Sequence, residues 1–178
     1  MRNLSLFSLL IFLLAGCNPP ASQCKQFAAV TQQSTSIREA FDQDIETAQV
    51  KLSGAQSLSD LQGGAKDYAA AVNKVIAQLN TMTQAFEQIN ITDEQLSEYR
   101  SQYLSFVEGS KSALTEANGA MQMVIESKNE RDFRAIFGTF TAQSDRAYNK
   151  LKALDTQENE ILTQLNSYCT ESVGLPKS

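Results

Sequence analysis

Apolar side chains recur every three or four positions along most of the chain, in four runs separated by short polar breaks. This spacing places the apolar residues of each run on one face of an α-helix. It predicts helices over residues 22–52, 59–89, 92–124 and 133–168. Capping-box spacing marks the predicted starts of the second helix, at Ser59 and Gln62, and of the third, at Thr92 and Gln95.

Four helices of roughly 30 to 40 residues, joined by short turns, must return alongside one another. We therefore predict an all-α protein, an antiparallel up-down-up-down four-helix bundle with coiled-coil-like packing over residues 24–169. Residues 170–178 include Gly174 and Pro176, and we expect them to form a flexible C-terminal tail.

A separate apolar run covers residues 4–14, close to the N-terminus. Arg2 precedes it, and the small residues Ala15 and Gly16 follow it, which is the layout of a cleaved export signal over residues 1–16. The run is too short to cross a bilayer, which takes roughly 20 apolar residues. We therefore expect a signal peptide rather than a membrane span.

The residues Leu14, Ala15, Gly16 and Cys17 together resemble the lipobox of bacterial lipoproteins. The resemblance implies that the chain is cut before Cys17 and that this cysteine carries two or three acyl chains, such as palmitate. Two or three chains anchor a protein stably, whereas one is marginal. The alternative is an ordinary secretory signal with an incidental cysteine.

The residues after Cys17 refine this expectation. Residues 17–23 contain two prolines and are expected to form a lipidated tether to the domain. In lipoproteins of two-membrane bacteria, Asp after the lipidated cysteine favours retention in the inner membrane, and here this position is Asn18. The resemblance therefore favours the outer membrane where the host has one, with the domain facing the periplasm or the exterior.

Charge and composition narrow the possible chemistry. The chain has 15 basic and 20 acidic residues, and loss of the signal removes one basic residue, Arg2, leaving 14 against 20 and a net charge of −6. An acidic chain does not attract nucleic acid, so we expect no such partner. The absence of His excludes histidine-based triads, di-iron motifs and histidine zinc or haem sites. We expect no metal, no cofactor and no enzymatic activity.

Two cysteines remain beside Cys17. In the predicted topology Cys24, in the first turn of the first helix, and Cys169, in the last turn of the fourth, lie at the same end of the bundle. In an oxidising envelope such neighbours form a disulfide. The alternative is two free thiols, one of them a nucleophile or a link to another chain.

One carboxylate falls on an inward apolar stripe. Glu158 on the fourth helix lies at about the height of Ser34 on the first helix and Tyr103 on the third. A buried carboxylate without partners is costly, so we predict that these two hydroxyl groups satisfy it in a polar layer that fixes the helix register. The alternative is a rotation of the fourth helix that exposes Glu158 to solvent.

Small and large side chains face each other in the half of the bundle away from the lipid. The third helix carries Ala113, Ala117 and Ala120 there, and the fourth brings Phe137 and Phe140 opposite them. One interpretation is complementary packing. The other is a slot that holds a small apolar ligand between the helices.

These observations favour a non-enzymatic, lipid-anchored protein of the cell envelope. In the first hypothesis the helical bundle is a structural, assembly or protein-interaction module that contacts an envelope protein through its polar side or through the turns at residues 53–57 and 127–130. In the second hypothesis it is a sensor or carrier with an apolar ligand in the alanine-lined slot.

Overall fold

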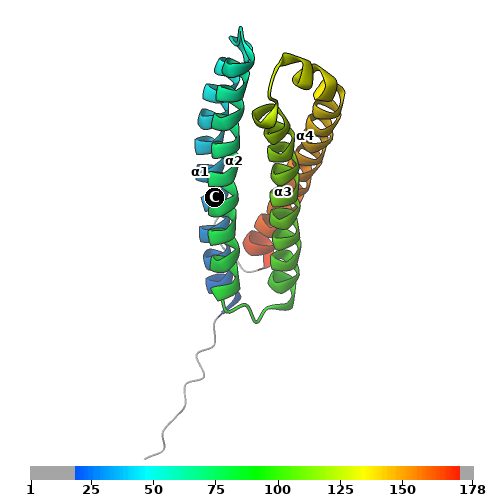
Figure 1. The fold of residues 1–178 in the computed structure, drawn as a ribbon. Helices are drawn as coiled ribbons and strands as arrows, with labels where there is room; N and C mark the ends of the chain where they lie inside the picture. Colours follow the sequence, from blue (N-terminus) through cyan, green and yellow to red (C-terminus); the bar gives the residue numbers. More distant parts are fainter. Residues whose placement is uncertain (1–18, 173–178) are drawn as a thin grey trace, which may run out of the picture.

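The computed structural model describes residues 19–172, and in this range the chain forms four long helices. They are α1 (Pro20–Ser53), α2 (Leu58–Gln88), α3 (Glu94–Glu126) and α4 (Glu130–Ser167), which continues into a π-helical turn, η1 (Tyr168–Ser172). Successive helices run in opposite directions (Figure 1). The predicted all-α, up-down-up-down four-helix bundle is confirmed. The signal segment and Cys17 lie outside the described residues.

The first helix begins earlier than its apolar pattern predicts. α1 starts at Pro20, inside the segment 17–23 that the sequence assigns to a tether. Proline is tolerated at this position because the N–H groups of the first helical turn have no intrahelical partner. Gln23 is consequently helical and buried. The predicted tether is therefore too long.

The cap of α2 also differs from the prediction. Ser57 and Asp60 form its capping box, in place of Ser59 and Gln62, because the helix already begins at Leu58. The Ser57 hydroxyl oxygen accepts a hydrogen bond from the Asp60 backbone N–H at 3.2 Å, and the Asp60 carboxylate accepts one from the Ser57 N–H at 3.0 Å.

The cap of α3 is Asp93, one residue after the predicted Thr92. The Asp93 carboxylate accepts a hydrogen bond from the Leu96 backbone N–H at 2.9 Å. The helix begins at Glu94, so Thr92 lies one residue before the cap position. Its hydroxyl oxygen accepts a hydrogen bond from the side-chain amide of Gln23 at 2.9 Å instead.

The helical path continues past residue 170, where the sequence predicts a flexible tail. Cys169 lies in η1 and is bonded to Cys24, and the Thr170 hydroxyl donates a hydrogen bond to the Asn166 carbonyl oxygen at 2.8 Å. The covalent link holds this last turn against α1. The tail prediction is wrong for residues 170–172, and residues 173–178 lie outside the described range.

The core differs between the two ends of the bundle, which we name the disulfide end, with Cys24 and Cys169, and the distal end. Near the disulfide end it is aromatic: the ring centroids of Phe27 and Phe86 are 5.0 Å apart, and those of Phe86 and Tyr103 are 5.1 Å apart. Burying each such ring contributes about 1.5–3 kcal/mol. Toward the distal end the buried residues are mostly alanines: Ala48, Ala65, Ala69, Ala71, Ala113, Ala117 and Ala120.

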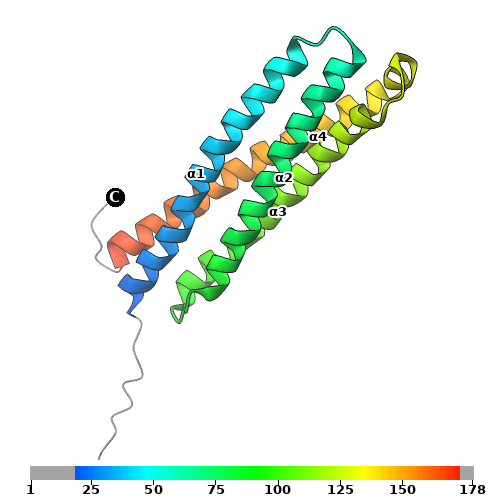
Figure 2. The ribbon, with the colours of Figure 1, turned by 60° about the vertical axis from the view of Figure 1, so that its left-hand side comes forward.

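The bundle is open on one side. α1 packs along α2, α2 along α3 and α3 along α4, whereas α1 and α4 share few close backbone contacts. Figure 2 shows that α4 is inclined, so that it ends near the start of α1 and diverges from α1 toward the distal end. α4 approaches α3 closely where Gly109 meets Leu154, since a Cβ at Gly109 would lie 2.8 Å from Leu154 Cδ2. Close packing on α3 leaves the α1 side of α4 uncovered.

Two adjacent glycines in α2 have opposite surroundings. A Cβ on Gly64 would lie 2.7 Å from Leu52 Cγ of α1, whereas a Cβ on Gly63 would meet nothing within 4 Å. Gly64 therefore permits the close approach of α1 and α2 at the distal end.

We predict that Gly64→Ala and Gly63→Ala change stability in opposite directions. Gly64→Ala should lower the free energy of unfolding by about 1–2 kcal/mol, because the new methyl group overpacks against Leu52. Gly63→Ala should raise it by up to about 1 kcal/mol, because alanine restricts the unfolded chain and fits the exposed helix. Urea denaturation of the two variants measures both effects. Equal shifts would contradict the proposed role of Gly64.

Candidate binding cleft

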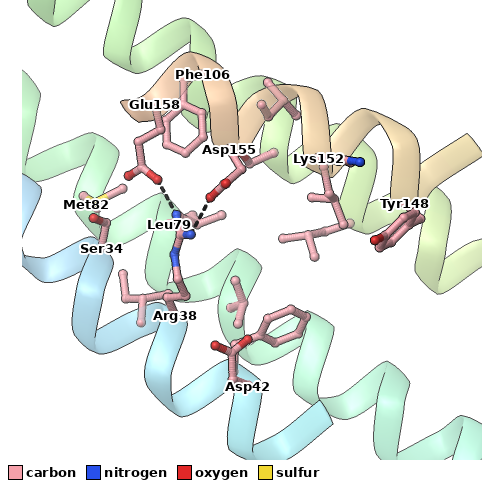
Figure 3. Close-up of a pocket in the computed structure, with 17 residues that line it drawn as sticks. Ser34, Arg38, Asp42, Leu79, Met82, Phe106, Tyr148, Lys152, Asp155 and Glu158 are labelled. Carbon is pink, nitrogen blue, oxygen red and sulfur yellow. Dashed lines mark hydrogen bonds and ion pairs between the residues drawn. The ribbon is translucent and has the colours of Figure 1, made fainter. Parts of the chain in front are cut away.

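An apolar cleft of about 440 Å³ opens between α1 and α4 (Figure 3). α1 and α4 form its rims, and α2 and α3 form its floor. The residues that line it are Ser34, Ile37, Arg38, Phe41, Asp42, Val75, Leu79, Met82, Phe106, Ser110, Leu114, Tyr148, Leu151, Lys152, Leu154, Asp155 and Glu158. The cleft occupies the side of the bundle that the inclination of α4 leaves open.

The floor and the rims of the cleft differ in polarity. Among the described residues that line it from α2 and α3, only Ser110 is polar. Val75, Leu79 and Leu114 are almost fully buried. On the rims Ile37, Phe41, Leu151 and Leu154 are only partly buried, although their spacing predicts inward positions in a closed bundle. If α1 and α4 packed against each other, their contact would cover these four side chains.

One group of charged residues crosses the cleft. The Arg38 guanidinium on α1 donates hydrogen bonds to the carboxylates of Asp155 and Glu158 on α4 (Figure 3). The other carboxylate oxygen of Glu158 accepts a hydrogen bond from the Tyr103 hydroxyl at 2.9 Å. Glu158 is only 3% exposed, while the side chains of Arg38 and Asp155 are 52% and 49% exposed. The bridge therefore joins a buried carboxylate to the surface.

The electrostatics of this group keep Arg38 and Tyr103 in fixed protonation states. Burial raises the pKa of the Tyr103 phenol, and the negative charge of Glu158 raises it further. The hydrogen bond to Asp155 raises the pKa of the Arg38 guanidinium against the opposing effect of burial. Tyr103 thus remains a neutral donor and Arg38 a cation at physiological pH.

In the polar layer predicted from the sequence, Glu158 is the acceptor, as expected, and Tyr103 is one of its donors. Tyr103 bonds Glu158 directly, and Ser34 lies within hydrogen-bonding reach of Tyr103. The alternative, a solvent-exposed Glu158, is wrong. Sequence reasoning missed Arg38, the cation that neutralises Glu158. The sequence feature that could have identified Arg38 is its position four residues after Ser34, one helical turn along the same face of α1.

The disulfide end holds a second polar cluster. Cys24 and Cys169 form the predicted disulfide, with sulfur atoms 2.06 Å apart and both residues buried. Beside it the Gln23 side-chain oxygen accepts hydrogen bonds from the backbone N–H groups of Thr92 at 2.8 Å and Asp93 at 3.1 Å. The Tyr168 hydroxyl donates to Asp93 at 2.8 Å. Together with the disulfide, these bonds tie the α2–α3 turn to the start of α1 and to the end of α4. They form a structural clamp.

The predicted slot in the distal half does not coincide with this cleft. Ala113, Ala117 and Ala120 are buried, but Phe137 is 52% exposed and points out of the core. Phe140 is partly buried. It contacts its helix neighbours Phe133 and Phe137, with ring centroids 6.4 and 6.2 Å away, and packs against the distal core residues Ala65, Met121 and Val124. The placement of Phe137 in a slot is therefore wrong. Phe133 and Phe140 fill the space beside the small distal core residues of α2 and α3, and Phe137 stays outside it.

The remaining described residues show no other chemical centre. No group of three or more His, Cys, Asp or Glu side chains is arranged to hold a metal ion within residues 19–172. In the same range no helix has the length and apolar character required to cross a bilayer. Comparison of the chain with protein-family models, curated proteins and solved structures finds no match.

Proposed function

We propose that this protein is a non-enzymatic, lipid-anchored binding protein of the cell envelope that holds a small apolar ligand in the α1–α4 cleft. The observation that carries the proposal is the cleft itself, about 440 Å³ with an apolar floor. Small-molecule sites commonly measure roughly 300–1,000 Å³ and combine apolar walls with a few polar groups. The ligand site thus lies near the middle of the bundle and not in its distal half.

The charged groups of the cleft support binding over catalysis. The sequence has no His, and the buried carboxylate of Glu158 has hydrogen bonds to both of its oxygens. Acid–base catalysis needs a group with a pKa near the working pH that is free to exchange a proton with substrate. Arg38 and Tyr103 have pKa values shifted away from neutrality.

Lipid anchoring in this proposal rests on the lipobox at residues 14–17. α1 begins at Pro20, three residues after Cys17, and three residues span at most about 10 Å. The disulfide end would therefore lie close to the lipid, and the distal end would face away from it. The acidic domain itself would have little attraction for anionic lipid.

We predict that Cys17→Ser moves the protein from the membrane fraction to the soluble fraction of cells. Loss of the acyl chains removes about 0.8 kcal/mol of membrane affinity for each buried methylene, and no described helix can span the bilayer in their place. Fractionation followed by immunoblotting measures the change, with Cys24→Ser as the control that should stay with the membrane. Retention of Cys17→Ser in membranes would refute the anchor.

We also predict that the cleft binds an apolar dye. N-phenyl-1-naphthylamine, which fluoresces in apolar surroundings, should bind the Cys17→Ser protein in detergent-free buffer. Leu151→Trp places an indole at the cleft mouth and should weaken binding by about tenfold or more, comparable to losing about two methylenes of contact.

Gly138→Ala, a change on α4 with nothing within 4 Å, serves as the control for this experiment and should bind the dye as the parent does. Circular dichroism establishes that both variants are folded. Absence of dye binding, or equal binding by Leu151→Trp, contradicts the assignment of the cleft.

A second candidate function is protein docking at the distal end. Phe133, Phe137 and Phe140 form an aromatic cluster on α4, and Phe137 is half exposed. Exposed aromatic residues often dominate the binding energy of protein interfaces. A photoreactive amino acid at Gly138 should then capture an envelope protein in intact cells, and Phe137→Ala should abolish that capture while leaving dye binding unchanged.

A further inference from the structure

We propose that the ligand of the α1–α4 cleft is a fatty acid, with its hydrocarbon chain along the apolar floor and its carboxylate at the mouth beside Lys152. This inference rests on the proposed binding function of the cleft.

The cleft is an elongated groove. Its lining extends from Ser34 to Asp42 on α1 and from Tyr148 to Glu158 on α4, lengths of about 12 and 15 Å at 1.5 Å per residue. The lining residues on both rims follow the helix axes, so the groove runs along the bundle. This shape suits an extended apolar chain better than a compact ligand.

The length of the lining limits the length of the chain. An extended chain of single bonds advances about 1.2 Å per bond, one third of the roughly 3.6 Å that an extended residue spans. A lining of about 12–15 Å therefore accommodates about ten to twelve carbons. Met82 on the floor is flexible enough to follow such a chain.

The interior of the cleft offers no partner to a polar ligand. Ser110 is the one polar residue among the described lining residues of α2 and α3. On the rims Arg38 bonds two carboxylates, and each oxygen of Glu158 already accepts a hydrogen bond. A ligand with buried polar atoms would leave them unsatisfied, which is costly. A plain hydrocarbon chain avoids this cost.

The rims indicate where an anionic head group would lie. Asp42 on α1 and Asp155 on α4 repel a carboxylate from the vicinity of Arg38, whose charge they already balance. Lys152 lines the mouth on α4 and forms no salt bridge within residues 19–172. A fatty-acid carboxylate at the solvent-facing mouth would have Lys152 as its ionic partner.

Displacement of N-phenyl-1-naphthylamine from the Cys17→Ser protein tests the proposal. Octanoic, decanoic, dodecanoic and hexadecanoic acids, each below its micellar concentration, should bind about three- to fourfold more tightly per added methylene. The gain should stop near about twelve carbons, when the chain reaches the end of the cleft. Adamantane carboxylic acid, a compact apolar acid, should displace the dye at least about tenfold more weakly than dodecanoic acid.

Lys152→Ala should weaken the binding of dodecanoic acid by about two- to fivefold, because an exposed ion pair contributes about that much affinity. The binding of dodecanol, which has no charge, should not change. Lys66→Ala, at an exposed lysine of α2 outside the cleft, is the matched control and should change the binding of neither compound.

Three outcomes would overturn the fatty-acid assignment: an affinity independent of chain length, equal binding of the adamantane acid, or no effect of Lys152→Ala. If the dye binds and Leu151→Trp weakens its binding, but fatty acids do not displace it, then the binding function of the cleft stands and the fatty-acid inference fails. If the dye does not bind, both fail.

Discussion

Replacing both Cys24 and Cys169 with serine is expected to lower the free energy of unfolding by about 4–5 kcal/mol. The disulfide joins residues 145 positions apart, and the chain-entropy model gives about 5 kcal/mol for closing a loop of this length. The effect should be large in this fold because α1 and α4 share few other contacts. Without the bond, the Arg38 bridge still joins α1 to α4, and Tyr168 joins the end of α4 to Asp93, the cap of α3.

Urea denaturation of the Cys17→Ser protein with and without the two serine substitutions measures this effect. The double substitution avoids leaving a free thiol in either state. Treatment of the parent with reductant under denaturing conditions, followed by dilution, should reproduce the lower stability of the double variant. Unfolding midpoints that coincide would show that the clamp contributes nothing to stability.

Arg38→Ala is expected to cost about 2–3 kcal/mol of stability. The substitution leaves the carboxylate of Glu158, 3% exposed, with Tyr103 as its remaining described hydrogen-bond donor. A buried charge that loses its counter-ion is strongly destabilising, whereas an exposed ion pair contributes about 0–1 kcal/mol. Asp155→Ala removes only the exposed partner of Arg38 and should therefore cost less than about 1 kcal/mol.

The double variant Arg38→Ala with Glu158→Gln separates loss of charge balance from loss of packing. Glutamine still accepts the Tyr103 hydrogen bond but carries no charge, so more than half of the lost stability should return. Thermal and urea unfolding of the three variants give the comparison. If Glu158→Gln restores nothing, the Arg38 side chain stabilises the protein by covering apolar surface and not by pairing with Glu158.

Much of the fold follows from features within single helices. The spacing of apolar residues gives four helices, and short turns between long helices leave an antiparallel bundle as the available arrangement. Cys24 and Cys169 fall at one end by topology alone, so their pairing needs no knowledge of side-chain contacts. Glu158 and Tyr103 could be matched because their heights follow from the rise per residue.

The cleft could not be predicted in this way because it depends on the angle between two helices. Apolar spacing shows which face of α4 is apolar but not how far that helix inclines toward α3. The inclination is associated with a contact between Gly109 and Leu154, residues with 44 positions between them. For the same reason Phe137 was expected inside the distal half and lies exposed.

Arg38 illustrates a second limit. The spacing of apolar residues identifies the inward face of a helix, but it does not identify a charged residue at the edge of that face. A long side chain at such a position can nevertheless reach across to a neighbouring helix. Its partner Asp155 lies three residues before Glu158, on the same side of α4. Pairing such edge residues between helices that are distant in sequence requires the structure.

The position of the disulfide also ties covalent closure to synthesis of the whole bundle. Cys169 follows the fourth helix, so the bond with Cys24 cannot form until all four helices have been synthesised. A chain that ends within the bundle keeps a free thiol at Cys24 and lacks the turn that carries Cys169. The oxidised pair is therefore a chemical mark of a chain that contains all four helices, and thiol labelling of Cys24 would distinguish chains truncated within the bundle from chains that contain it whole.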